Sequence, residues 1–428
     1  MPAPKYFDQL YRQDPNYFNH VEGLRAFAAI WMMFYHMALF AAFFYPQAEY
    51  LQLIKHPFFK IALSSSVSLD IFFVISGLVI GHALIKELKY KNSIDPYSFL
   101  VRRCARVYPL YLLLIVITLP FFSTTLPNVW TNILQINNIL PIAEQHLVWT
   151  WSLAVDFQFY ALFAAIMWLI AKDVLGKKSC YALTLIFLIM PFVITALLIS
   201  LHQLHHLSPA AYIPRGPESR LYFSMGFDKL YVRSGPFLYG VLTAYVLIYH
   251  RDKLRQSLES IPENIINLFC IITLSLMLLL LANDPIWHVH KAQPLWQTSS
   301  YWSILLQRNI FSLLLCAILL LADYPKGIVM RIILKILNLA VWRPFGQLTF
   351  STYLIHPIII LIGFSIFFAH HSAVTAEHYF QFGLWLMLIS YLIAIPLYLL
   401  VEQPAMHHLK QKLLRLNLIQ IKKGSSLE

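Results

Sequence analysis

Long apolar runs separated by short polar segments dominate the chain from residue 24 to residue 401. Ten of these runs are long enough, or nearly so, to cross a hydrocarbon core of about 30 Å as an α-helix. They are 24–45, 67–85, 107–123, 149–171, 181–201, 235–250, 264–282, 302–322, 346–369 and 383–401. Lipid offers no hydrogen-bond partners to backbone groups, so such runs must be helical. The pattern predicts an all-α fold, a polytopic membrane helix bundle with about ten transmembrane helices.

The composition agrees with this pattern. Of the 428 residues, 59% are hydrophobic and only 12% are charged, and the mean hydropathy is +0.63. Soluble domains carry about a quarter charged residues. The four cysteines are scattered without metal-ligand spacing, so we predict neither a disulfide framework nor a metal site.

Lysine and arginine are distributed unevenly between the predicted loops. With the N-terminus inside, 23 of the 32 Lys and Arg fall in inner segments and 7, including Arg233, in outer loops. Positively charged loops stay in the cytoplasm. We therefore expect both termini to be cytoplasmic. The net charge of +12 follows from this bias and requires no nucleic-acid partner.

The chain divides into three predicted parts. Residues 1–22 form a polar, amphipathic cytoplasmic segment, residues 23–404 form one membrane domain, and residues 405–428 form a basic cytoplasmic tail. The final GSSLE resembles a vector-derived extension. Within the membrane domain, segment 326–343 places basic residues at helical spacing on an apolar background, which predicts an interfacial helix on the inner leaflet.

Ionisable side chains inside a membrane are costly and are therefore candidates for function. Arg25 and His36 lie eleven residues apart, which puts them on one helix face about 16 Å apart along the axis. Asp156 and Asp70 could supply the carboxylate that fixes the tautomer of an imidazole. The alternatives are a snorkelling anchor for Arg25, a hydrogen bond between helices for His36, a structural role for Asp156 and a helix cap for Asp70.

Two apolar runs carry polar side chains at helical spacing. They are Ser152, Asp156 and Tyr160 in one run, and Thr349, Thr352, Tyr353 and His356 in another. These stripes could line a site or only join helices. Arg308, inside the eighth run, needs an anion or water as partner.

The stretch RRCARVYPLY places Arg102, Arg103 and Arg106 at the inner start of the third run. Clustered arginines bind phosphate oxygens through paired hydrogen bonds. The alternative is a topology signal that contacts lipid headgroups. A phosphate-binding mouth below a histidine and carboxylates would suit general-base chemistry on a phosphorylated ligand.

Seven stretches, in order along the chain, resemble the acyltransferase-3 family of multi-pass membrane O-acyltransferases. They are GLRAFAAIWMMFYH, SLDIFFVISGLVIG, RRCARVYPLY, WSLAVDFQFY, RSGPFLYGVLTA, FSTYLIHP and EQP at 402–404. Each stretch alone is a weak signal, and the order of seven is specific. Asp156 stands where family members often carry Glu, which shortens the reach of the carboxylate and keeps its charge.

The resemblance implies transfer of an acyl group, usually acetyl, from cytoplasmic acyl-CoA to a hydroxyl of an extracytoplasmic cell-surface glycan. Lipopolysaccharide O-antigen is one such acceptor, and a lipid-linked sugar is another. The implied location is the bacterial cytoplasmic (inner) membrane, among membrane lipids. Acetyl-CoA is the expected donor substrate, without a metal. The chain resembles the stand-alone type, without an appended hydrolase-like domain.

Residue roles follow from this reading. The expected catalytic residues are His36, Asp156 and Asp70, the expected acyl-CoA-binding residues are Arg25, Arg102, Arg103 and Arg106, and the candidates for acceptor or oxyanion contacts are Trp151, Tyr353, His356 and Arg308. His36 would act as the general base, and a covalent acyl-His36 intermediate stays open. The rival function is a proton-coupled secondary transporter or exporter of a small or anionic solute, with the three catalytic candidates as a proton relay.

Overall fold

All regular structure is helical in the part of the computed structural model that is described, residues 19–121, 123–174, 177–204, 217–282, 302–370, 375–408 and 411. The predicted all-α class is confirmed. The helices of the first half are α2 (Asn19–Phe44), α3 (Gln47–Leu53), α4 (Pro57–Leu63), α5 (Ser68–Lys91), α6 (Pro96–Thr118), α7 (Val129–Ile133), α8 (Trp151–Ala171) and α9 (Lys177–His202). Those of the second half are α10 (Pro217–Gly226), α11 (Leu230–Tyr249), α12 (Arg251–Ser260), α13 (Glu263–Ala282), α15 (Arg308–Ala322), α16 (Ile328–Leu337), α17 (Trp342–Gln347), α18 (Thr349–His370) and α19 (Ala376–Leu397).

The predicted terminal parts fall largely outside the described residues. Of the segment 1–22, residues 1–18 are not described, and of the tail 405–428, residues 409–410 and 412–428 are not described.

Eight helical stretches of the described chain are long and apolar enough to cross a membrane, so the protein is a multi-pass membrane protein. They are Asn19–Phe44, Pro57–Lys91, Pro96–Phe121, Val148–Ala171, Glu263–Ala282, Ile304–Ala322, Thr349–His370 and Ala376–His408. Ten spans were predicted from hydropathy, and eight of them are candidate spans among the described residues. The other two predicted runs are helical as parts of α9 and α11, but only Leu188–His202 of α9 stands out as a shorter apolar helix. Helix α11 contains Arg233 and several tyrosines among its apolar residues.

Helix α6 begins earlier than the third apolar run suggests. The side chain of Asp95 accepts a hydrogen bond from the backbone N–H of Ser98 over 3.0 Å. Pro96 follows in the first helical turn, where a backbone N–H would have no partner within the helix, so a proline costs no hydrogen bond there. The arginine cluster therefore lies inside a rigid helix, where its side chains have fixed directions.

Helices α5 and α11 form the most extensive helix pair, and glycines allow their close approach. A Cβ atom at Gly77 would lie 2.0 Å from the carbonyl oxygen of Phe237, so no larger residue fits there. Near the start of both helices, Arg233 and Asp70 form an ion pair with a 2.8 Å contact, and both side chains are fully buried. This corrects the assignment of Arg233 to an outer loop, since the residue lies in α11 within the protein core.

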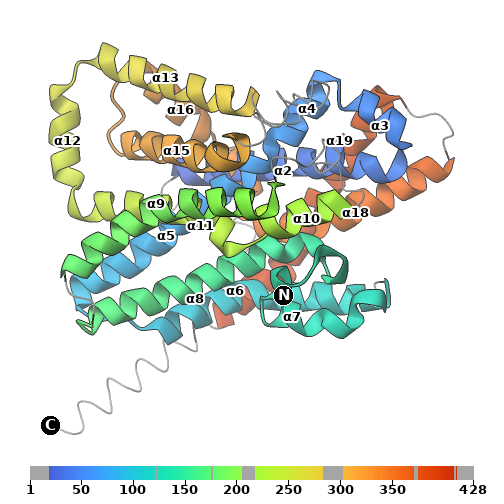
Figure 1. The fold of residues 1–428 in the computed structure, drawn as a ribbon, viewed down its shortest axis with the longest axis horizontal. Helices are drawn as coiled ribbons and strands as arrows, with labels where there is room; N and C mark the ends of the chain where they lie inside the picture. Colours follow the sequence, from blue (N-terminus) through green and yellow to red (C-terminus); the bar gives the residue numbers. More distant parts are fainter. Residues whose placement is uncertain are drawn as a thin grey trace, which may run out of the picture.

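The arrangement of the helices brings distant segments together around α2. Helix α2 packs against α5, α17 and α18, and α8 packs against both α5 and α6. Figure 1 shows α6 and α8 side by side along one edge of the molecule, while α13, α15 and α16 lie together at the opposite edge. The helix predicted within 326–343 is present as α16, with Ile328, Ile332 and Ile336 exposed along one face. Its place at a membrane surface stays a prediction.

Candidate active site

A cavity of about 150 Å³ lies among α2, α5, α6, α8, α17 and α18. Its polar lining contains three arginines, one carboxylate and several hydroxyl groups. These residues are Arg25, Arg103, Arg106, Asp156, Ser76, Ser152, Tyr160, Thr349 and Tyr353. The remaining lining is mostly apolar and includes Met32, Phe72 and Phe73. The cavity joins charged and apolar walls, which suits a ligand with both an anionic and an apolar part.

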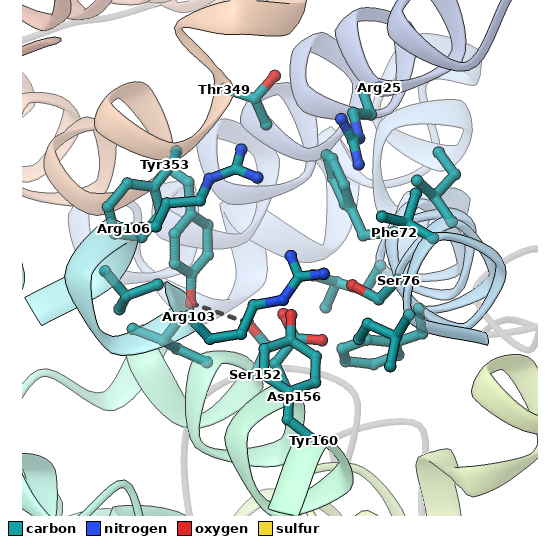
Figure 2. A pocket seen from close by; sticks show the side chains of 18 of the residues that line it. Arg25, Phe72, Ser76, Arg103, Arg106, Ser152, Asp156, Tyr160, Thr349 and Tyr353 are labelled. Atoms are coloured by element: carbon teal, nitrogen blue, oxygen red, sulfur yellow. Dashed lines mark hydrogen bonds between the residues drawn. The ribbon is translucent and has the colours of Figure 1, made fainter. Parts of the chain in front are cut away.

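Three guanidinium groups face this cavity. In Figure 2, the side chains of Arg25, Arg103 and Arg106 extend around the same space from two different helices. Arg103 lies over the ring of Tyr160, 5.5 Å from its centroid, which fixes the direction of the guanidinium. Because the walls exclude much of the water, the attraction of these cations for a phosphate is stronger than it would be on an open surface.

The carboxylate of Asp156 lies in the same cavity, close to the Arg103 guanidinium (Figure 2). It interacts with the hydroxyl groups of Ser76 and Tyr160 and with the charge of Arg103. Its Oδ1 atom is buried and has no hydrogen-bond partner among the described residues. A buried oxygen in this state is unfavourable. Oδ1 is therefore available to accept a hydrogen bond from a ligand.

His36 of α2 and His356 of α18 form a hydrogen-bonded pair. The distance between His36 Nδ1 and His356 Nε2 is 3.0 Å, and His356 Nδ1 lies 2.9 Å from the carbonyl oxygen of Thr352. A carbonyl oxygen only accepts, so His356 Nδ1 carries the proton, and neutral His356 accepts the Nδ1 proton of His36 at Nε2. In this tautomer the lone pair of neutral His36 lies on Nε2, which is the state that a general base requires. His36 also forms a hydrogen bond with the backbone of Met32.

The imidazole pair adjoins the cavity without forming part of its lining. Met32, one helical turn before His36, lines the cavity, and so does Tyr353, which lies on α18 shortly before His356. The Tyr353 and His356 rings are 6.4 Å apart between centroids. Tyr353 also shares a 2.8 Å hydrogen bond with Ser152, which ties α18 to α8. The cavity that holds the arginines and Asp156 thus lies beside the two histidines.

Three predicted site residues lie in a second buried cluster, centred on Arg233, and do not line the cavity. Asp70 pairs with Arg233, whose guanidinium lies 5.2 Å from the ring centroid of Trp151. Arg308 donates a hydrogen bond to the carbonyl oxygen of Gly226 over 2.9 Å. Asp70 also lies in the first turn of α5, where a negative charge is favourable, but the N-cap position is Val67 and no side-chain cap hydrogen bond forms there.

Arg102 is also absent from the cavity lining. Its side chain is exposed, and its charge acts on Asp95 at the start of α6. The RRCAR stretch thus separates into one arginine at the surface and two, Arg103 and Arg106, at the cavity.

The sequence analysis did not single out two further carboxylates, Glu22 and Glu402. Glu22 pairs with Arg25 over 2.8 Å and also accepts a hydrogen bond from Gln347. Glu402 is buried and accepts a hydrogen bond from Ser351. The only signal for Glu402 was its place in the EQP segment. In the part of the chain that the structure describes, no group of three or more His, Cys, Asp or Glu could hold a metal ion.

The chain matches the family model described as an acyltransferase domain over residues 18–401. It is similar to the O-acetyltransferase OatA of Staphylococcus aureus, with 29% identity over 181 residues, which cover 38% of this chain and 26% of that protein. Protein 2 in the picA locus of Rhizobium radiobacter is 32% identical over 108 residues, 25% of this chain and 47% of that protein. The matched region thus spans about a quarter of OatA and about half of the Rhizobium protein. No solved structure gives a significant match.

Proposed function

The chain belongs to the acyltransferase-3 family of membrane O-acyltransferases, and on this premise we propose that it transfers an acetyl group from cytoplasmic acetyl-CoA to a hydroxyl of an extracytoplasmic glycan. The proposed setting is the bacterial inner membrane, with both termini in the cytoplasm and the catalytic region within residues 23–404. Lipopolysaccharide O-antigen is a proposed acceptor. The observation that carries the proposal is one cavity that three arginines and Asp156 line and that lies beside the His36–His356 pair.

The arginines would hold the donor. Coenzyme A carries a diphosphate and a further phosphate on its ribose, so its polar end is strongly anionic. Arg25, Arg103 and Arg106 offer several N–H groups for these oxygens. The apolar walls, including Met32 and Phe72, would then contact the pantetheine arm and direct the thioester along the cavity. The donor would thus place its reactive carbonyl near the histidines.

His36 would act as the general base. Its Nε2 takes the proton of the acceptor hydroxyl while the hydroxyl oxygen attacks the thioester carbonyl carbon. The carbon–sulfur bond then breaks, and the departing CoA thiolate takes the proton from His36 Nε2. Throughout the reaction, His356 holds the Nδ1–H of His36 and keeps Nε2 turned to the substrate. Such positioned proton transfer contributes about 10²–10⁴-fold to a rate.

Asp156 would contribute from the lining of the same cavity. Its unpaired Oδ1 can accept a hydrogen bond from the acceptor or from the donor arm. Tyr353 donates its single hydroxyl proton to the carbonyl oxygen of Trp149, so an oxyanion role would require it to release this bond. Asp70, Trp151 and Arg308 lie in the second cluster, and we assign them no step in the reaction.

A proton-coupled transporter is the rival function, and acetyl transfer to membranes separates the two. Membranes that contain the protein are incubated with acetyl-CoA that carries a radiolabelled acetyl group, and free CoA and labelled glycan are measured. The proposal predicts that one CoA is released for each acetyl group that becomes attached to glycan, and that His36→Ala lowers both by at least about 10²-fold. Label that stays in acetyl-CoA, or near-normal turnover by His36→Ala, would contradict the proposal.

A further inference from the structure

The first turns of α2 contain an ion pair of which only one member lines the cavity. Arg25 Nη1 and Glu22 Oε1 lie 2.8 Å apart, and the two residues are one helical turn from each other. Arg25 lines the cavity, whereas Glu22 is buried and does not line it. A guanidinium group carries five N–H donors in a planar fork, so Arg25 can contact Glu22 and a phosphate in the cavity at the same time.

Hydrogen bonds from two other elements hold the Glu22 carboxylate in place. Gln347 Nε2, at the end of α17, donates to Glu22 Oε2 over 3.4 Å. The hydroxyl of Tyr398 in turn donates to Gln347 Oε1 over 3.3 Å. Tyr398 begins η12 (Tyr398–Glu402), a π-helical turn that follows α19. The carboxylate that contacts Arg25 is therefore tied to segments more than 300 residues away in the sequence.

A glycine gives the Glu22 carboxylate the room that it occupies. A Cβ atom at Gly346 would lie 2.7 Å from Glu22 Oε2 and 2.9 Å from the Glu22 backbone oxygen. Any larger residue at this position would have to displace the carboxylate or separate α17 from α2. Gly346 also lines the cavity, so this close contact lies at the cavity wall.

We propose that Glu22 is a positioning residue that orients the Arg25 guanidinium toward the phosphates of the donor before acetyl-CoA binds. Gly346 and Gln347 fix the carboxylate, and the carboxylate fixes Arg25. The inference rests on the proposed function, because it takes Arg25 as a phosphate-binding residue. An arginine side chain has many rotamers, so a guanidinium that is already oriented loses less freedom on binding and binds more tightly.

The charge of Glu22, taken alone, would have the opposite effect. A carboxylate repels an anionic donor, so an effect of charge alone predicts that Glu22→Gln binds acetyl-CoA more tightly. Positioning predicts that Glu22→Gln binds it more weakly. Gly346→Ala offers a second route, because it keeps the charge and displaces the carboxylate. The positioning role predicts weaker binding in both variants.

A donor without phosphates separates this role from general damage to the protein. Acetyl-pantetheine carries the thioester and the pantetheine arm but lacks the phosphates of coenzyme A. The test is equilibrium binding of acetyl-CoA and of acetyl-pantetheine to the purified full-length protein in nanodiscs. We expect Glu22→Gln to weaken binding of acetyl-CoA about tenfold, the scale of one charge-assisted hydrogen bond, and binding of acetyl-pantetheine by no more than about twofold. Gly346→Ala should show the same selectivity.

Two further variants serve as controls. Glu263→Gln removes a carboxylate from the exposed pair with Arg331, in which the two charged groups lie 3.2 Å apart. Surface pairs contribute little, so this variant should bind both donors as the wild type does. The double variant Glu22→Gln/Arg25→Gln should bind acetyl-CoA no more weakly than Arg25→Gln alone, because a residue that acts through Arg25 has no effect once Arg25 is lost.

The possible failures have different meanings. Unchanged or tighter acetyl-CoA binding in Glu22→Gln or Gly346→Ala, equal losses for both donors, a selective loss in Glu263→Gln, or a further loss in the double variant would overturn the positioning role and leave the proposed function intact. Unchanged acetyl-CoA binding in Arg25→Gln would instead contradict the proposed donor site at Arg25. If Glu22→Gln does not fold, Glu22→Asp takes its place, because aspartate keeps the charge and withdraws the carboxylate by one methylene group. A loss confined to acetyl-CoA would then support the role, and equal losses or no loss would overturn it.

Discussion

Replacing Asp70 by asparagine decides whether this carboxylate is mainly structural or catalytic. Asp70 Oδ1 lies 2.8 Å from Arg233 Nη1, and neither side chain is exposed. Arg233 keeps its contacts with Phe227 and Trp151 in the variant. Its Nε donates to the carbonyl oxygen of Phe227 over 2.8 Å, and its guanidinium lies 4.2 Å from the Phe227 ring centroid. The substitution therefore removes the charge that balances Arg233 and leaves the packing nearly unchanged.

Removing one partner of a buried ion pair costs about 3–5 kcal/mol, because it leaves an uncompensated charge. The amide that replaces the carboxylate keeps an acceptor oxygen, so we expect a loss near the lower limit, about 3 kcal/mol. Arg233→Met should cost a similar amount, since it leaves the carboxylate alone. The double variant Asp70→Asn/Arg233→Met contains no unpaired charge, so its loss should fall well below the sum of the two single losses.

Thermal unfolding in detergent, followed by tryptophan fluorescence, measures this effect. Trp151 packs against Arg233 and should report on the cluster. We expect Asp70→Asn to lower the Tm by about 5 °C or more and to retain acetyl transfer at temperatures well below its transition. An unchanged Tm would refute the reasoning. An unchanged Tm with loss of transfer would support the catalytic role predicted from the sequence.

Three further predictions concern the cavity and its surroundings. His356→Asn should lower the rate of acetyl transfer by about tenfold or more and leave acetyl-CoA binding unchanged, because His36 loses the partner that fixes its tautomer; unchanged transfer would contradict this. Arg103→Ala should weaken acetyl-CoA binding by about tenfold, whereas exposed Arg102→Ala should have little effect, and equal losses would show that the cavity does not distinguish the two. Burial raises the pKa of Asp228 from 3.8 to about 6. Between pH 6 and pH 4 the folded state therefore keeps a proton on Asp228 that the unfolded state has lost. Because of this difference, Asp228 makes the folded state more stable as the pH falls from 7 toward 4. Asp228→Asn should reduce that gain in Tm, and an identical pH profile would argue against it.

The helices could be predicted because each is a long apolar run. All ten predicted runs coincide with helices, although only eight stretches of the described chain are long and apolar enough to count as spans. Hydropathy misses the first turns of α6, because Arg102 and Arg103 make them polar. The cap at Asp95 and the proline that follows it carried the missing signal.

The partners of the polar side chains could not be predicted, because they depend on which helix faces meet. His36 and His356 were each placed on a polar face, yet 320 residues separate them in the sequence. Asp70 was considered as a cap or a catalytic group, and its partner Arg233, 163 residues away, was counted as a loop charge. The cavity shows the same limit. The residue types in RRCAR were enough to predict phosphate binding by arginine. Only the direction of each side chain in the structure shows that Arg103 lines the cavity and Arg102 does not.

The central claim is that the arginines and His36 serve the two ends of one bound donor. The most direct measurement is a structure of the His36→Ala variant with acetyl-CoA, because the variant should bind the donor without consuming it. We predict that phosphate oxygens lie about 3 Å from the guanidinium groups of Arg103 and Arg106, with the thioester carbonyl at the end of the cavity next to residue 36. Acetyl-CoA bound outside this cavity, or with its thioester directed away from residue 36, would contradict the account.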